Sequence, residues 1–172
     1  ISKLNEANEL FVKIYPGESA NRQPVHTVYG GANLFKHNTA EKFGKLSQTA
    51  LHQYAPNFVV LAHALKLPGH ETLPVTEAEI SRLVDSVNEL GVDPSNKQLW
   101  LPYTVYRQVK QKLESEALED FRIDFEDGFG NRPDDEEDAV AVQAAREVAT
   151  GMQKGTLPPF IGIRIKPFNR EA

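Results

Sequence analysis

The last third of the chain changes its spacing of apolar residues twice. Residues 121–127 alternate apolar and polar side chains, which is the pattern of a strand with one buried face. Residues 133–154 follow with apolar positions three and four apart, acidic residues at the start and Gly155 just past the end, which predicts a helix. Residues 160–166 alternate again and predict a second strand. This order predicts a βαβ unit with parallel strands.

The first two thirds of the chain predict mainly helices. Residues 4–15 form a helix-prone lead, and residues 25–29 are rich in β-branched and aromatic side chains. That composition predicts a short strand, which Gly30-Gly31 is expected to end. Four further helices are expected to begin near Asn38, Phe58, Thr76 and Pro102.

Capping signals mark the first and third of these four helices. Asn38 is followed three residues later by Glu41, and Thr76 by Glu79, so each pair predicts a capping box. Gly91 is placed to end the third helix. The first helix carries an apolar stripe that is expected to face the interior, and the stripe consists of Phe43, Leu46, Ala50 and Tyr54.

The two later strands share a two-faced pattern. The polar face of the first consists of Arg122, Asp124 and Glu126, and that of the second of Gly162, Arg164 and Lys166. An open doubly wound sheet is covered by helices on both sides, which requires two apolar faces. A (β/α)₈ barrel instead has an apolar outer face and a mouth at the carboxyl ends of the strands that can be polar. The predicted α/β fold is therefore a TIM barrel.

The composition of the chain limits which classes of binding partner are expected. With 172 residues, of which 40% are apolar and 25% charged, the chain is expected to form one domain over residues 1–172. The net charge of −5 and the absence of a dense basic block argue against nucleic acid and anionic membranes as partners. Without cysteine there is neither a disulfide nor a thiolate site, which fits a cytoplasmic protein. No apolar stretch approaches the ~20 residues that a membrane span needs.

Four charged residues are the main candidates for chemistry. Asp124, Glu126 and Asp127 end the first of the two strands, and Arg164 lies on the second. Carboxylates can hold Mg²⁺ directly or through its waters, and an arginine can bind a substrate carboxylate or stabilise a developing oxyanion. The alternative is an internal ion-pair network that only stabilises the barrel, because partly buried charges need opposite neighbours.

The remaining candidates each have a structural alternative. Gly30-Gly31 could offer backbone N–H groups to an anion, although a plain tight turn is favoured. His26 could line the mouth, although a packing role is favoured, and Lys166 is either at the site or on a surface loop. The acids at 134–138 are expected to be a solvated first helical turn that complements the helix dipole.

Two motifs carry a family resemblance. IDFEDG at 123–128 and GIRIKP at 162–167, separated by a helix that acids open, resemble the HpcH/HpaI aldolase and citrate lyase beta-subunit family. The stretch QPVHTVYGGA at 23–32 further resembles a bacterial branch of that family. Its members are phosphoenolpyruvate/pyruvate-type TIM barrels whose corresponding segments read approximately D-L-E-D and V-R-I-N-P. Either motif alone would be a weak signal, and the pair is more specific.

The resemblance implies a lyase that makes or cleaves a carbon–carbon bond through an enolate, with Mg²⁺ or Mn²⁺ as cofactor. Arg164, Glu126 and Asp127 would be catalytic, the two acids lying near the water shell of the metal. The substrate would be a small carboxylate or acyl-CoA ester, and the residues expected to bind it are Arg164, Asp124, Gly30, Gly31 and Lys166. A homo-oligomer is also expected.

Three departures from the family pattern limit these expectations. The direct metal ligands of the family lie on later strands, beyond residue 172, so the chain looks like the first part of a barrel that is inactive alone. About ninety residues separate the first two strands, so residues 41–116 are interpreted as a helical insertion. Lys166 stands where many relatives have asparagine, which leaves free keto acids and CoA esters both open as substrates.

Overall fold

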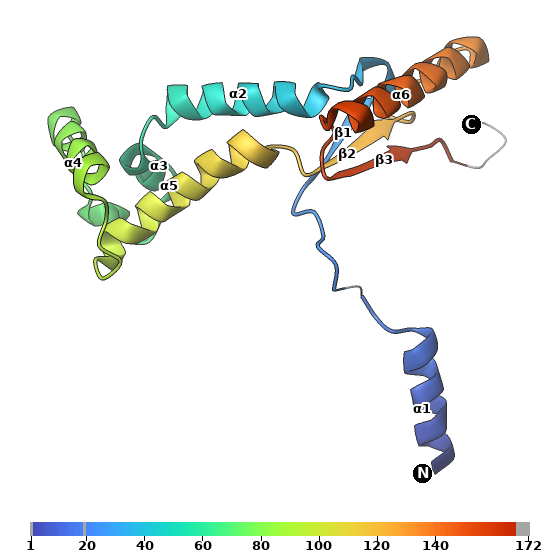
Figure 1. Cartoon of the computed structure of the whole chain (residues 1–172), viewed down its shortest axis with the longest axis horizontal. Coiled ribbons are helices and arrows are strands. Elements are labelled where there is room, and N and C mark those ends of the chain that lie inside the picture. Colours follow the sequence, from blue (N-terminus) through green and yellow to red (C-terminus); the bar gives the residue numbers. More distant parts are fainter. Residues whose placement is uncertain (1, 19, 168–172) are drawn as a thin grey trace.

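The centre of the protein is a three-stranded parallel sheet. The computed structural model describes residues 2–18 and 20–167, so the ends of the predicted 1–172 domain lie partly outside the described residues. The strands are β1 (Thr27–Gly31), β2 (Asp120–Asp124) and β3 (Phe160–Arg164), in the order β1-β2-β3. Helix α6 (Asp134–Lys154) connects β2 to β3, which confirms the predicted βαβ unit (Figure 1).

The strand ends differ from the prediction. The strand predicted over 25–29 begins two residues later and includes Gly30 and Gly31, which were expected to end it. Strands β2 and β3 end earlier than predicted, although the N–H of Phe125 still bonds the carbonyl of Arg164 at 2.9 Å. The glycines continue β1 because its ladder with β2 reaches the last residues of both strands, pairing Gly31 with Asp124.

Helix α6 covers the apolar face of β2. Phe121, Ile123 and Phe125 are buried on this face, as predicted, and form one core with Ala144 of α6. The 3-10 turn η1 (Ala32–Leu34) closes the same core next to α6. Burying each of these large side chains stabilises the fold by about 1.5–3 kcal/mol. The opposite, polar face of the sheet carries no covering helix among the described residues.

The outer face of β3 is only partly covered. Ile161 packs against the α6 core, whereas Ile163 and, just after the strand, Ile165 are exposed, although a barrel would cover its apolar outer face with helices. The difference arises because α6 lies over β1 and β2, and β3 is the edge strand of the described sheet.

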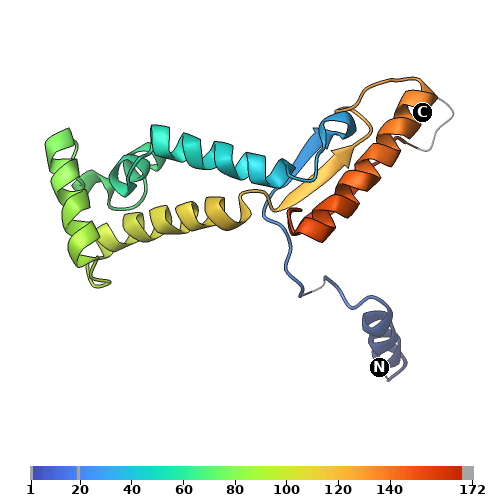
Figure 2. The ribbon, with the colours of Figure 1, turned by 45° about the horizontal axis from the view of Figure 1, so that its top comes forward.

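Between β1 and β2 the chain forms a long helical arm. Residues 41–116, the expected insertion, are mostly helical, and their role as an insertion in a barrel stays a prediction. The elements of the arm are α2 (Thr39–Tyr54), α3 (Phe58–Leu65), the 3-10 turn η2 (His70–Thr72), α4 (Glu77–Leu90) and α5 (Lys97–Glu116). Helices α2 and α5 run side by side away from the sheet, and α3 and α4 lie at the far end (Figures 1 and 2). The far end has its own apolar core, which includes Phe58, Val59 and Val87.

The predicted inner stripe of α2 is wrong. Phe43, Leu46 and Tyr54 are exposed, and Gly44 is the buried residue of this helix. Gly44 faces the end of α5, where an added Cβ would lie 3.5 Å from the carbonyl oxygen of Leu113, and Gln48 donates to the same carbonyl at 3.1 Å. The helix therefore packs through the side next to its apolar stripe.

The predicted capping boxes do not form as expected. Asn38 makes no side-chain cap, and the hydroxyl of Thr76 donates to the carboxylate of Glu79 at 2.5 Å instead of accepting from the backbone. Pro102 was expected to open the fourth helix of the arm and lies inside α5. That helix begins earlier because Asn96 caps it, accepting from the N–H of Leu99 at 3.3 Å.

Helix α1 (Ser2–Ile14) stands apart from the sheet and the arm (Figures 1 and 2). None of its side chains is buried. Within the described parts of the chain, no helix is both long enough and apolar enough to cross a membrane.

Candidate functional site

The polar face of the sheet brings charged residues from β2 and β3 into one row. The register places Gly31, Asp124 and Arg164 side by side at the carboxyl ends of the three strands. Residues paired across parallel strands project from the same face, so the side chains of Asp124 and Arg164 meet there. The alternation in the sequence predicted this shared face correctly.

Asp124 and Arg164 form a bidentate ion pair. Nε of Arg164 donates to Oδ1 of Asp124 at 2.8 Å, and Nη2 donates to Oδ2 at 2.5 Å. The side chain of Asp124 is 1% exposed and that of Arg164 is 31% exposed. The hydrogen bonds from Arg164 lower the pKa of Asp124 to about 2, although burial alone would raise it. The pair therefore stays ionised over the whole physiological range.

Asp124 also shapes the loop that follows β2. It accepts the N–H of Glu126 at 2.9 Å and that of Gly128 at 2.8 Å. Glycine is needed at both 31 and 128. A Cβ on Gly31 would overlap the carbonyl oxygen of Gly128, and a Cβ on Gly128 would lie 2.6 Å from Oδ2 of Asp124. One buried carboxylate thus positions both the arginine and the loop that carries the next two acids.

Glu126 and Asp127 approach the same guanidinium from the loop. Oε2 of Glu126 lies 3.3 Å from Nε of Arg164, and Oδ2 of Asp127 lies 3.3 Å from Nη1. The side chain of Asp127 is 82% exposed, so it can leave Nη1 at little energetic cost. The four predicted catalytic and substrate-binding residues on β2, β3 and this loop are therefore brought together.

Lys166 lies beyond β3 and pairs with the first turn of α6. Its Nζ is 2.5 Å from Oε2 of Glu137, and both side chains are mostly buried. Glu137 is thus an exception in the predicted solvated turn, whose other acids are exposed. Lys166 thus faces α6 rather than Arg164, and its predicted role in substrate binding stays a prediction.

Gly30 and Gly31 are strand residues, so the favoured tight turn is wrong. The ring of Phe121 fills the space next to Gly30 on the core side. Their predicted contribution to substrate binding stays a prediction.

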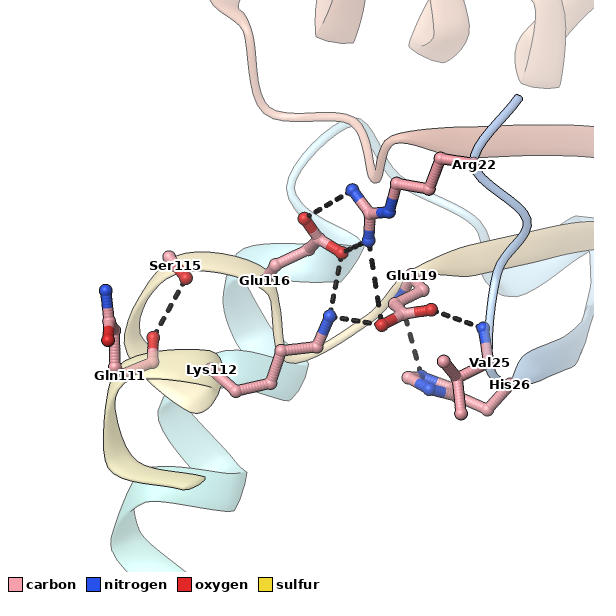
Figure 3. A network of polar contacts seen from close by, with 8 residues as sticks. All are labelled: Arg22, Val25, His26, Gln111, Lys112, Ser115, Glu116 and Glu119. Atoms are coloured by element: carbon pink, nitrogen blue, oxygen red, sulfur yellow. Dashed lines mark hydrogen bonds and ion pairs between the residues drawn. The ribbon is translucent and has the colours of Figure 1, made fainter. Parts of the chain in front are cut away.

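His26 lies outside β1 and is exposed, so neither the mouth nor a buried packing role fits it. Its Nε2 accepts the N–H of Glu119 at 3.4 Å, at the amino end of β2, while a carboxylate oxygen of Glu119 accepts the N–H of Val25 at 2.5 Å. Figure 3 shows these contacts. This end of the strands is opposite the candidate site.

The same end holds an ion-pair cluster that attaches the segment before β1. Arg22 donates to Glu116, with one contact at 3.0 Å, and Lys112 donates to Glu116 at 2.8 Å and also pairs with the buried Glu119 (Figure 3). The hydrogen bond from Arg22, and to a smaller extent that from Lys112, lowers the pKa of Glu116 to about 2. The cluster has a structural role, because it connects residues distant in sequence.

Two groups on the polar face were missed by the sequence reasoning. The ring of Tyr29 lies 4.7 Å from Cζ of Arg164. Two rows below the site on this face, Asp120 is buried and accepts from Thr27 at 2.8 Å and from Arg122 at 2.9 and 3.0 Å, all through Oδ2. Strand alternation could have placed Tyr29 and Asp120 on this face, but the register between β1 and β2 was needed to locate them.

A cleft of about 490 Å³ lies away from these charges. It is lined by α2, the end of α5 and residues 155–159, and so opens near the amino ends of β2 and β3. Arg164 and its carboxylates do not line it. We place the candidate site at the carboxyl ends because the converging charges are there.

The site offers part of a donor set for Mg²⁺. The side chain of Asp127 is exposed and that of Glu126 is 35% exposed, and Mg²⁺ typically uses one or two carboxylates together with waters. The described residues contain no group of three or more His, Cys, Asp or Glu side chains arranged to hold a metal. The donors fit the chemistry of the ion without completing its coordination.

Fold and site together define a mixed α/β protein with an arginine–carboxylate cluster at the carboxyl ends of parallel strands. Residues 4–172 match the family described as "Domain of unknown function (DUF6986)", and the chain belongs to that family. No curated protein and no solved structure matches the chain.

Proposed function

We propose that the intact protein is a metal-dependent carbon–carbon lyase of the aldolase or citrate-lyase type. It acts through an enolate on a small keto acid or acyl-CoA ester in the cytoplasm. The observation that carries this proposal is the position of Arg164. Its guanidinium is fixed by the buried Asp124 and contacted by Glu126 and Asp127 on a sheet face that no described helix covers.

The proposed architecture is a (β/α)₈ barrel of which this chain contains the first strands. Three observations support it: the strands are parallel and adjacent in chain order, one face is polar, and α6 is a crossover on the other face. Exposed Ile163 on β3 and Ile165 just after it are the kind of surface that a further barrel helix would cover.

In the proposed chemistry, Arg164 binds the substrate carboxylate through Nη1 and stabilises charge that develops on the enolate oxygen. Asp124 fixes the guanidinium, because its two oxygens hold Nε and Nη2. Glu126 and Asp127 would hold the waters of Mg²⁺, and the bound ion would supply a Lewis acid for the carbonyl. Lys166, Gly30 and Gly31 would bind more remote parts of the substrate.

Ligand binding by the full-length protein tests this proposal. Isothermal titration with pyruvate, oxaloacetate and acetyl-CoA, each with Mg²⁺, is expected to give binding by at least one of them. Arg164→Lys should weaken that binding at least tenfold, because lysine cannot replace a bidentate guanidinium. Arg122→Lys, on the same face one row lower, is the matched control and should bind normally. Absence of binding by the wild-type protein would rule the proposal out.

A second candidate is a non-catalytic binding or assembly domain in which the acids form a structural ion-pair network. It is favoured by the three carboxylates around Arg164, which already compensate its charge, and by the separate apolar core of the arm. This alternative predicts that Asp127→Asn destabilises the fold and leaves every ligand affinity unchanged. The lyase proposal predicts the reverse, because Asp127 is exposed.

A further inference from the structure

Tyr29 reaches across a whole strand to the arginine of the site. It lies on β1 and Arg164 on β3, and β2 separates the two strands. Even so, the Tyr29 ring centroid lies 4.7 Å from Cζ of Arg164, within the range of a cation–π contact. The two long side chains therefore meet above β2, where Asp124 lies.

The guanidinium of Arg164 is held on more than one side. Asp124 accepts hydrogen bonds from Nε and Nη2, and the Tyr29 ring lies against the guanidinium. The remaining nitrogen, Nη1, lies 3.3 Å from the exposed carboxylate of Asp127. Of these partners, Asp124 is buried and fixed by the backbone, whereas Asp127 can move away. Nη1 is thus the atom that can exchange its partner for a ligand.

Tyr29 is itself open to solvent. It is 54% exposed, and it belongs to neither of the two apolar cores. A large aromatic side chain in this position contributes little to burial, so its contact with the cation is the main interaction that the described residues offer it. Aliphatic residues would provide similar contact area without the attraction of the ring face for a positive charge.

We propose that Tyr29 is a positioning residue for Arg164, whose ring orients the guanidinium so that Nη1 meets a substrate carboxylate. This inference rests on the proposed function for the identity of the ligand. The proposed role depends on the aromatic ring of Tyr29 and not on its hydroxyl. Phenylalanine at position 29 should therefore preserve the orientation of Arg164, and leucine should not.

Oxalate is the probe, because it presents a planar pair of carboxylates. Titrated with Mg²⁺ into the full-length protein, it should bind Tyr29→Leu about five- to thirtyfold more weakly than wild type, the range that a cation–π contact of this kind supplies. Tyr29→Phe should bind within about twofold of wild type on the same grounds. Tyr54 is an exposed tyrosine on the arm, and Tyr54→Leu is the matched control that should leave the affinity for oxalate unchanged. Equal binding by Tyr29→Leu and wild type, or equal loss in the Phe and Leu variants, would overturn the inference.

A second measurement separates this inference from the proposed function. The Nε–H of Arg164 is donated to Asp124, and its hydrogen exchange can be followed by NMR without any ligand. Exchange should be at least severalfold faster in Tyr29→Leu and normal in Tyr29→Phe. If wild type binds no oxalate but exchange responds in this way, the lyase proposal fails and the positioning role of Tyr29 stands. If the exchange of the Nε–H is the same in Tyr29→Leu as in wild type, the positioning role is overturned, whether or not oxalate binds.

Discussion

Removing the carboxylate of Asp124 is the most informative test of how the site is built. Asp124→Ala deletes the acceptor of two hydrogen bonds from Arg164 and of two backbone N–H groups, those of Glu126 and Gly128. All four donors would lose a partner at once. The matched control is Asp127→Ala, which removes an acid from the same loop and the same arginine.

The structure sets the size of the effect. Breaking a buried ion pair by removing one partner typically costs 3–5 kcal/mol. Arg164 is 31% exposed, so water can partly solvate the freed guanidinium, and we expect a loss of about 3 kcal/mol in the free energy of unfolding. Asp127 is 82% exposed, and its removal should cost about 0–0.5 kcal/mol.

Urea denaturation of the full-length protein at pH 7 measures both changes. The midpoint should fall clearly for Asp124→Ala and barely for Asp127→Ala, with an unchanged slope in both because the folded state stays equally compact. If the two variants lose the same stability, the buried acid does not organise the site and our reasoning about its geometry is refuted.

Three further variants test other parts of the structure. Glu116 has a pKa depressed from 4.5 to about 2 by Arg22 and Lys112, so its contribution is fully present above pH 4.5 and is lost as the pH falls towards 2. The shift corresponds to about 3 kcal/mol, which solvent screening reduces to about 1–2 kcal/mol. Glu116→Gln should therefore lower the free energy of unfolding by that amount at pH 7 and only slightly at pH 2, which acid titrations of unfolding measure. Gly162→Ala should destabilise because a Cβ there overlaps the guanidinium of Arg122, and thermal melts of the double variant with Arg122→Ala should show less loss than the sum of the two single variants. Gly31→Ala should be worse than Gly162→Ala in the same melts, because its added Cβ meets backbone, which cannot rotate away.

The sequence predicted the βαβ unit well because independent local signals agreed there. Acids fill the first turn of α6, and Gly155 ends it in the left-handed conformation at φ 64°. Strand alternation then put Asp124 and Arg164 on one face, and the structure confirms that they meet.

Other features could not be predicted because they depend on tertiary contacts. Periodicity identified the apolar stripe on α2 but not the side that packs, because the contact of Gly44 and Gln48 with the end of α5 depends on how the two helices meet. Tyr29 was missed because its contact with Arg164 depends on pairing between strands about ninety residues apart. Asn96 was overlooked as a cap because Pro102 gave a stronger local signal for a helix start.

The central claim is that Arg164 supports formation of an enolate. The most direct measurement is deuterium incorporation into the methyl groups of pyruvate and acetyl-CoA, followed by NMR in D₂O with Mg²⁺ and the full-length protein. Enolisation breaks a C–H bond of the methyl group and returns a deuteron from D₂O, so these protons exchange even when no carbon–carbon bond is cleaved. We predict Mg²⁺-dependent exchange in wild type and in Arg122→Lys, and at least a tenfold loss in Arg164→Lys. Exchange that is absent from wild type for both compounds, or that is undiminished in Arg164→Lys, would contradict the claim.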